Sequence, residues 1–262
     1  MIRTLYTNGY LLRQLVKKDI RQRYQGSVLG VLWSLIVPVL MLVIYTFIFS
    51  EVFQAKWNMD TTDTYEFALM LFCGLSAFNL FGEVMNRSTT LIAVHANYVK
   101  KVIFPLEILP VVLVMSALFH AMISFCILIA ARLALYHRLS PEIWQLAPAL
   151  VPLVVMAVGV GLFIAAISVY LKDVGNVISV MVTVLMYISP VFFPLDAVPK
   201  DFRVVCEMNP MTYLIENLRN VTLYDRSLNW QFFGISGVAA LVIYLIGYTV
   251  FMRTKEGFPD VI

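Results

Sequence analysis

Residue types that could carry out chemistry are scarce inside the apolar stretches of this sequence. Histidine occurs only at His95, His120 and His137, and of these His120 alone lies well inside an apolar run. No HExxH pattern and no carboxylate at ligand spacing accompanies them, so no metal site is predicted. For His120, a hydrogen bond between helices inside a bundle is the plainer interpretation.

Nucleotide-binding and nucleophilic motifs are missing as well. The sequence has no G-x-x-x-x-G-K-[ST] loop to bind phosphates and no G-x-S-x-G elbow to activate a serine. All 16 Asp and Glu residues lie outside the apolar runs or at their margins, whereas ion-coupled carriers generally need carboxylates or broken helices at the membrane midplane. We therefore expect no catalytic residues and no cofactor in this chain, and any ATP hydrolysis must come from a partner.

Aromatic side chains, by contrast, are abundant in the apolar runs. Their faces suit the weakly apolar C–H faces of sugar rings, but aromatic residues also gather at membrane interfaces for ordinary reasons. Both interpretations stay open from residue type alone. The residues are Trp33, Tyr45, Phe47, Phe49, Phe78, Phe81, Phe163, Tyr170, Tyr187, Phe192 and Phe193.

Composition indicates that a membrane must position these residues. Of 262 residues, 61% are hydrophobic and 13% are charged, with a mean hydropathy of +0.84, whereas soluble domains carry about 25% charged residues. The net charge of +3 is small and the basic residues concentrate in the first 23 positions, which argues against a nucleic-acid partner. Cys73, Cys126 and Cys206 are far apart and are expected to be small buried hydrophobes.

Six runs lack Asp, Glu, Lys and Arg, which are costly at mid-bilayer. Five exceed the roughly 20 residues that a crossing helix needs. The second is shorter, so Glu66 and Glu83 at its ends must lie near the two interfaces. The runs are 24–50, 67–82, 108–131, 143–171, 174–195 and 227–252. They predict six transmembrane helices at about 28–50, 66–86, 106–131, 146–170, 174–194 and 230–252.

The distribution of basic residues predicts the orientation. With six spans both termini lie on one side, and 12 of the 19 Lys and Arg residues fall on that side. The positive-inside rule then places both termini in the cytoplasm. No cleavable signal is expected, because the basic N-terminal stretch leads into an apolar run too long for a signal peptide.

Residues 9–24 are predicted to form an amphipathic helix in the cytoplasmic interface. Its apolar face holds Leu11, Leu12, Leu15, Val16 and Ile20. A basic face toward anionic lipid would hold Arg13, Lys17, Lys18, Arg21 and Arg23. A plain positively charged flank without a functional surface is the alternative.

Two further segments are too short or too broken to cross. In the cytoplasmic loop 87–104, Leu91, Val94, His95 and Tyr98 have helical spacing, which predicts a short amphipathic helix that could insert into a partner's groove. A connector on the membrane surface is the alternative. Residues 188–226 contain four prolines and an apolar helical pattern, which predict a helical hairpin dipping into the outer leaflet beside the exit of a pathway.

Six segments in order resemble the type-2 ABC transporter permeases that export O-antigen, capsule and teichoic-acid chains. The resemblance covers nearly the whole chain. The segments are RYQGSVLGVLWSLIVP from Arg23, YTFIF from Tyr45, YLKDVGNV from Tyr170, SPVFFPLDAVP from Ser189, NPMTYLIENLRNVTL from Asn209 and the tail KEGFPDVI.

The resemblance implies a homodimer with two copies of a separate P-loop ATPase that binds ATP and magnesium, moving lipid-linked polysaccharide of the O-antigen type across the inner membrane. It implies that a coupling helix at about 88–101 docks on the ATPase, and that spans one and five line the channel. Coupling residues would be Leu91, Val94, His95, Asn97, Tyr98, Lys100 and Lys101, and channel-lining residues Trp33, Tyr45, Phe49 and Tyr187.

The expected organisation is thus an all-helical polytopic membrane protein. Residues 1–27 form the cytoplasmic N-terminus, 28–254 the transmembrane domain with short re-entrant periplasmic helices at 195–226, and 255–262 a cytoplasmic tail. Two alternatives remain: a drug or antibiotic exporter of the same superfamily, and an ion-coupled lipid or glycolipid flippase.

Overall fold

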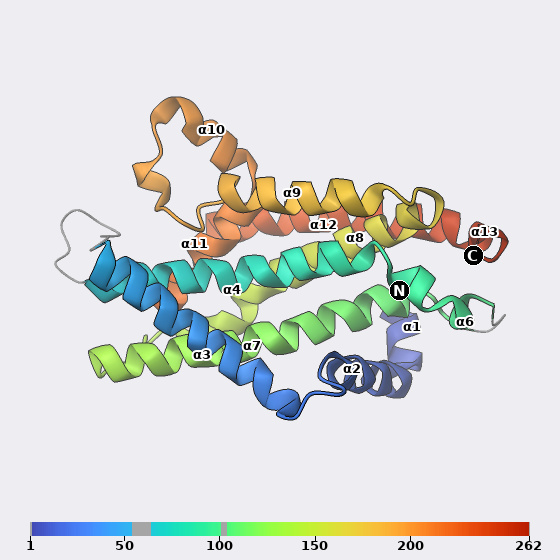
Figure 1. The fold of residues 1–262 in the computed structure, drawn as a ribbon. Coiled ribbons are helices and arrows are strands. Elements are labelled where there is room, and N and C mark those ends of the chain that lie inside the picture. Colours follow the sequence, from blue (N-terminus) through green and yellow to red (C-terminus); the bar gives the residue numbers. More distant parts are fainter. Residues whose placement is uncertain (1, 54–63, 101–103, 262) are drawn as a thin grey trace.

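The computed structural model describes residues 2–53, 64–100 and 104–261, and every regular element in these ranges is a helix. This confirms the all-helical class. Long helices lie side by side, and the N- and C-terminal ends of the chain lie at the same end of the bundle (Figure 1). We call this the terminal end and the opposite one the far end.

Among the described residues, five helices are long and apolar enough to cross a membrane. They correspond to predicted spans one, two, three, four and six. The first comprises η1 (Gly30–Leu32), α3 (Trp33–Tyr45) and the π-helical η2 (Thr46–Val52). The others are α4 (Thr64–Ser88), α7 (Ile108–Tyr136), α8 (Leu146–Tyr170, after η3, Ile143–Gln145) and α12 (Trp230–Thr254, followed by η5, Lys255–Gly257, and α13, Phe258–Val261).

The predicted fifth span at 174–194 is shorter than expected. Its helix, α9, covers Val174–Ile188, and Ser189 already has extended backbone with ψ of 148°. Ser189 precedes Pro190, and a residue before proline is disfavoured in the helical region, so the helix ends there. Fifteen residues make about 22 Å of helix at 1.5 Å per residue. By length alone, α9 falls short of the roughly 30 Å of hydrocarbon in a bilayer.

The second span is longer than its apolar run. α4 continues beyond residues 67–82 at both ends and includes Glu66, Glu83 and Arg87. Glu83 and Arg87 are one helical turn apart and their side chains pair at 3.1 Å, so these two charges compensate each other along the helix. α4 lies at the centre of the bundle, in contact with α3, α7, α8 and α9, and most of its residues are buried.

Glycines allow the closest helix pair, α8 with α12. A Cβ at Gly247 would overlap the carbonyl oxygen of Gly159, and a Cβ at Gly159 would lie 2.5 Å from the Cα of Tyr244. The two backbones therefore touch, as at many small-residue interfaces between membrane helices.

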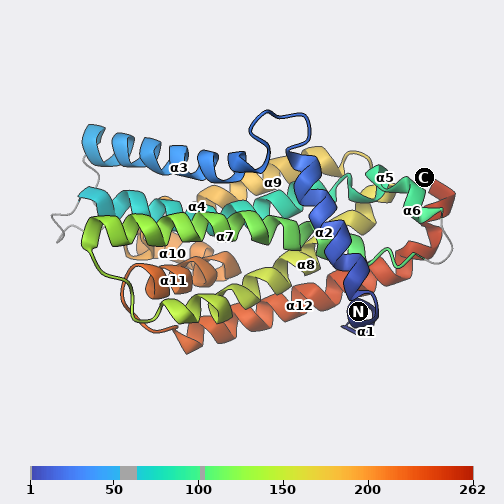
Figure 2. The ribbon, with the colours of Figure 1, turned by 90° about the horizontal axis from the view of Figure 1, so that it is seen from below.

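At the terminal end, α1 (Ile2–Thr7) leads into α2 (Gly9–Arg23), which confirms the helix predicted over 9–24. Figure 2 shows α2 lying across the long helices rather than along them. Its apolar face packs on α7, where Leu15 joins Ile108 and Val112 in one buried cluster. Gly26, with φ of +86°, then turns the chain toward α3 in the left-handed conformation that glycine tolerates.

At the far end, the predicted helical hairpin consists of α10 (Lys200–Met208) and α11 (Pro210–Thr222), preceded by the short η4 (Leu195–Ala197). Asn209 ends the first helix and caps the second by accepting a hydrogen bond from the backbone N–H of Met211 at 3.0 Å. The predicted apolar face of α11 is buried, namely Met211, Leu214, Ile215, Leu218 and Val221. α10 projects away from the bundle (Figure 1).

Candidate functional site

The loop after α4 is helical but is not the single helix that was predicted. α5 (Leu91–Val94) and α6 (Ala96–Val99) are two short turns separated at His95, whose φ of −105° and ψ of 26° interrupt the helix. The His95 ring holds this break, because Nδ1 lies 2.9 Å from the Leu91 carbonyl oxygen. The loop is therefore kinked, with its apex pointing away from the bundle.

The break separates residues that were predicted to share one face. Leu91 is buried against the core, as are Ile92 and Val99, whereas Val94 is 75% exposed. Tyr98 is half-buried and stacks on Phe104 with ring centroids 4.5 Å apart. The exposed apex consists of Ala93, Val94, Asn97 and Lys100. Lys101, also predicted for this surface, lies outside the described residues.

α2 is tied to α4 by a network of charges beside this loop. Arg87 donates to Asp19 at 2.6 Å and to Glu83 at 3.1 Å, and Arg23 donates to the same Glu83 oxygen at 2.6 Å. Arg13, Lys17, Lys18 and Arg21 of α2 remain exposed. Asp19 and Glu83 bring the basic helix and the second span together, a partnership that spacing along the chain does not reveal.

The loop and α2 border one open groove of about 770 Å³. One wall comes from α2 (Lys18, Asp19, Gln22), the floor from Glu83 and Arg87, and the other wall from Val94, His95, Asn97 and Tyr98. Lys18 Nζ lies 6.0 Å from the centre of the Tyr98 ring, so the two walls approach each other. The predicted interface helix and the predicted coupling loop thus form a single surface.

A polar cluster continues from this groove into the bundle. Tyr24 Oη lies 3.3 Å from His120 Nδ1 on α7, so the predicted helix-helix hydrogen bond of His120 is instead made to the segment after α2. Burial raises the pKa of the Tyr24 phenol. The adjoining pocket, about 240 Å³, is also lined by Trp33, Ser34 and Asn79.

The four aromatic residues predicted to line a channel do not share one surface. Trp33 and Tyr187 are on the outside of the protomer, and Tyr187, 63% exposed, stacks on Phe192 at 5.6 Å. Tyr45 and Phe49 face inward, with Phe49 stacked on Phe67 at 5.0 Å. Within one protomer the four residues therefore split between exposed and inward-facing positions, on the first span and on α9.

Two of the quoted segments meet at the terminal end. Tyr170, which ends α8, donates a hydrogen bond to the Thr254 carbonyl oxygen at 2.8 Å. Its ring also packs on Phe258 of the tail, which is fully buried and contacts Phe251 as well. The tail is therefore fastened to the bundle over its described part.

Two arginines at the far end have structural roles that the sequence did not reveal. Arg219 is 0% exposed and donates to the carbonyl oxygens of Met70, Pro190 and Val191 at 2.7–3.2 Å. Arg132 donates to the Thr222 carbonyl oxygen and to Asp225, each at 2.6 Å. Both arginines lie in positions that were predicted to be loops or the margins of spans. The spacing of apolar residues there does not indicate that an arginine is buried.

The described residues contain no group of three or more His, Cys, Asp or Glu side chains that could hold a metal ion. The terminal end combines an exposed apex, a groove lined by charged residues and the helix α2, which is tied to α4. Such a surface suits binding and the transmission of movement.

Comparison with known proteins connects this arrangement to transport. The profile of the ABC-2 type transporter family matches residues 10–223. An O-antigen export system permease protein of Klebsiella pneumoniae is 24% identical and spans 98% of both chains. A polysialic acid transport protein of Escherichia coli is 24% identical over 91% of both. A capsule polysaccharide export inner-membrane protein of Neisseria meningitidis is 23% identical over 98% of this chain and 95% of its own.

Proposed function

The chain belongs to the ABC-2 type transporter family, and we propose that it is the membrane permease subunit of an ATP-driven exporter of lipid-linked polysaccharide of the O-antigen type. The observation that carries this proposal is similarity along the full length of permeases named for O-antigen and capsule export. The drug-exporter alternative has no comparable support among these relatives.

A separate ATPase supplies the energy in this proposal. The sequence has no P-loop, so ATP and magnesium are bound by the partner, present in two copies against a permease homodimer. The kinked loop α5–α6 is the docking element because its apex is exposed while Leu91 and Ile92 anchor it in the core. If the ATPase displaced the apex, this short loop would transmit the movement directly to α4.

We place six crossings in the inner membrane, with both termini in the cytoplasm. Five helices have the necessary length among the described residues, and both chain ends lie at one end of the bundle (Figure 1), which requires an even number of crossings. α9 would be the remaining crossing. Local thinning of the bilayer and the 189–194 segment would make up the difference between the length of α9 and the thickness of the hydrocarbon layer. α10 and α11 then lie on the periplasmic side.

The channel would form between two protomers rather than within one. α3 and α9 both carry long exposed apolar faces, including Val39, Leu40, Val43, Val180 and Val184. In this arrangement α3 and α9 of the two copies face each other, and ATP-driven closure of the partner separates them. Trp33 and Tyr187 would line the opening, and Tyr45 and Phe49 would contact sugar only after α3 rotates.

The charge network gives α2 a part in the same movement. Because Arg87 joins Asp19 of α2 to Glu83 of α4, a displacement of the docking loop would move the interface helix as well. The lipid anchor of the substrate would enter near this basic helix, where Arg13, Lys17, Lys18, Arg21 and Arg23 favour anionic groups.

Co-purification with a P-loop ATPase tests the proposal. We would express the permease with candidate ATPases, isolate complexes in detergent and measure ATP hydrolysis and glycan export. Val94→Asp should abolish ATPase binding, because it places a charge at the exposed apex. Val28→Asp is the matched control, since Val28 is fully exposed in the α2–α3 linker and should leave assembly intact.

A wild-type complex with two copies of each chain and loss of the ATPase only in Val94→Asp would support the proposal. Failure of any ATPase to bind, combined with export that stops when the proton gradient is dissipated, would instead favour an ion-coupled flippase. Export of small amphiphiles without glycan export would favour a drug exporter.

A further inference from the structure

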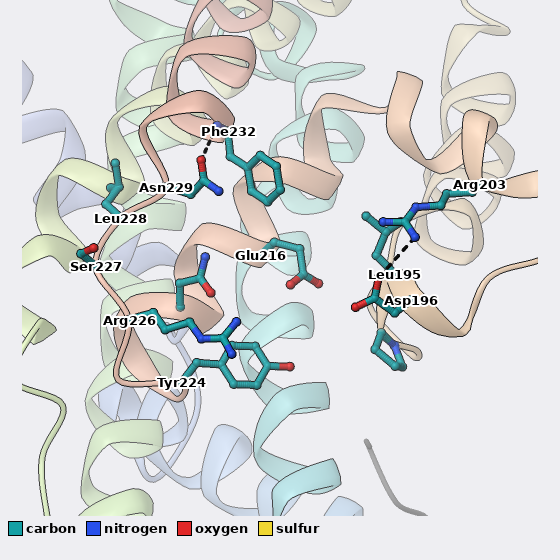
Figure 3. Close-up of a pocket in the computed structure, with 12 residues that line it drawn as sticks. Leu195, Asp196, Arg203, Glu216, Tyr224, Arg226, Ser227, Leu228, Asn229 and Phe232 are labelled. Carbon is teal, nitrogen blue, oxygen red and sulfur yellow. Dashed lines mark hydrogen bonds and ion pairs between the residues drawn. The ribbon is translucent and has the colours of Figure 1, made fainter. Parts of the chain in front are cut away.

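A separate pocket at the far end combines charged and aromatic side chains. It has a volume of about 730 Å³, within the roughly 300–1,000 Å³ of typical small-molecule sites. Figure 3 shows its two walls: Leu195, Asp196 and Arg203 on one side, and Tyr224, Arg226, Asn229 and Phe232 on the other, with Glu216 between them. These residues come from η4, α10, α11, the linker 223–229 and the start of α12.

The charges of this pocket balance. It is lined by two acidic residues, Asp196 and Glu216, and two basic residues, Arg203 and Arg226. Arg203 is already engaged, at 3.3 Å from Asp196 and 2.9 Å from Glu207. A site for a phosphate or carboxylate ligand would be expected to hold more arginine than acidic residues. This pocket has equal numbers of the two.

Donors and acceptors nevertheless remain open toward the cavity. Arg226 makes no ion pair with any described residue, and its guanidinium lies 5.4 Å from the centre of the Tyr224 ring. Glu216 pairs with Arg219 through Oε1 at 3.0 Å, and its carboxylate lies between the two walls of the pocket (Figure 3). A hydroxyl group both donates and accepts, so a polyhydroxylated ligand satisfies both kinds of group.

Aromatic rings complete the recognition surface. Phe232 lines the pocket and is held by Tyr213, with ring centroids 5.2 Å apart. Tyr224 lies on the same wall beneath Arg226 (Figure 3). Rings of this kind can cover the apolar C–H face of a sugar while the charged groups bind its hydroxyls.

We propose that this far-end pocket is a binding site for an uncharged sugar unit of the exported glycan. The inference rests on the proposed function, which puts the pocket on the periplasmic side where the chain emerges. A site there would bind the first sugars to emerge after each cycle of ATP hydrolysis and oppose their return into the channel. The preference for neutral over anionic sugars follows from the balanced charge of the lining.

The test uses the permease–ATPase complex in lipid nanodiscs. The probe is a neutral oligosaccharide fraction released by mild acid from the surface polysaccharide of the producing cell, with binding followed by saturation-transfer NMR. Wild type should bind the probe, and inorganic pyrophosphate should not displace it. Arg226→Gln should weaken binding at least about tenfold, the size expected for a lost hydrogen bond to a charged group.

Lys200→Gln provides the matched control, because Lys200 is an exposed cation of α10 that does not line the pocket. It should bind the probe as wild type does. Tyr224→Leu is a second pocket variant in case Arg226→Gln does not fold, and thermal unfolding in detergent reports the folding of each variant. Equal binding by folded pocket variants, or displacement of the probe by pyrophosphate, would overturn the proposal.

Glycan export by the same cells separates this inference from the function on which it rests. If wild type exports glycan but its complex binds no neutral oligosaccharide, the sugar site is wrong and the exporter stands. If wild type neither exports glycan nor binds the probe, both fail.

Discussion

Arg219 shows how a single charged residue can organise the far end of a membrane protein. Its guanidinium joins the carbonyl oxygen of Met70 on α4 to those of Pro190 and Val191 after α9. Gly74 leaves room for it, since a Cβ there would lie 2.9 Å from Arg219 Nη2. The termination of α9 at Ile188 is thereby stabilised by a donor on α11, 28–29 residues later in the chain than the carbonyl groups it binds.

We expect Arg219→Gln to destabilise the protein by about 3–5 kcal/mol, the range for breaking a buried ionic contact, because three carbonyl groups lose a charged donor and Glu216 loses its partner. Thermal unfolding in detergent measures the loss. Arg203→Gln is the control, since this exposed arginine makes only surface ion pairs and should unfold like wild type.

Cys206 offers a pH-dependent prediction at the residue scale. It is 6% exposed, and burial, together with the nearby Glu207, raises the pKa of its thiol. Because the thiolate is the reactive form, alkylation by iodoacetamide should be slower than that of a free thiol at pH 7 and should accelerate only at a more alkaline pH. The measurement uses a Cys73→Ala, Cys126→Ser background, and reaction at the rate of free cysteine at pH 7 would contradict it.

Among the elements, α8 and α12 depend most directly on glycine. Their backbones meet at Gly159 and Gly247, so the contact leaves no room for a side chain. Gly237, nearly three turns earlier on α12, has open space where a Cβ would lie. One helix therefore contains both a glycine required by packing and one that is not.

Gly247→Ala should accordingly lower the unfolding temperature, with an overpacking cost of about 1–3 kcal/mol or more. Gly237→Ala should be neutral or slightly stabilising, because alanine has the higher helix propensity. Differential scanning fluorimetry in detergent compares the two. Equal destabilisation by both would show that the contact between α8 and α12 does not set the effect.

The sequence predicted helices correctly where the pattern of apolar residues lies within one stretch of the chain. Apolar runs located five long helices, the face of α11 was read correctly from its spacing, and α2 was placed within a residue. Tertiary contacts explain the remaining differences: α4 extends past its apolar run because Glu83 and Arg87 are paired, and His95 interrupts the coupling loop by bonding the Leu91 carbonyl oxygen. The Asp19–Arg87 pair and the carbonyl contacts of Arg219 join residues 28–149 positions apart, which periodicity cannot detect.

At the scale of the whole molecule, α3 and α9 each leave a long apolar face uncovered in the single protomer. α4 contacts both α3 and α9 and is drawn between them in Figure 1, and the exposed apolar faces of α3 and α9 extend along much of both helices. In the proposed dimer these faces meet across the axis. A protomer alone would leave the route for sugar open to lipid.

This arrangement predicts a specific crosslink. In a cysteine-free background, copies carrying Val43→Cys on α3 and differently tagged copies carrying Val180→Cys on α9 should be joined by a short bis-maleimide. Val43 and Val180 are similarly exposed, at 59% and 64%. Copies carrying Val238→Cys on α12, 65% exposed, should not react with either, and crosslinking at α12 instead would place the dimer axis elsewhere.

The burial of α4 has a consequence for biosynthesis. Among the five helices long enough to span, α4 is the least hydropathic and the most enclosed by protein, because α7 and α8 cover much of its surface. Membrane insertion selects segments by their hydrophobicity as they leave the ribosome, and α4 emerges before either covering helix exists. A nascent chain that stops short of α8 would therefore hold α4 only loosely, and its stable entry into the bilayer must await the synthesis of the helices that follow it.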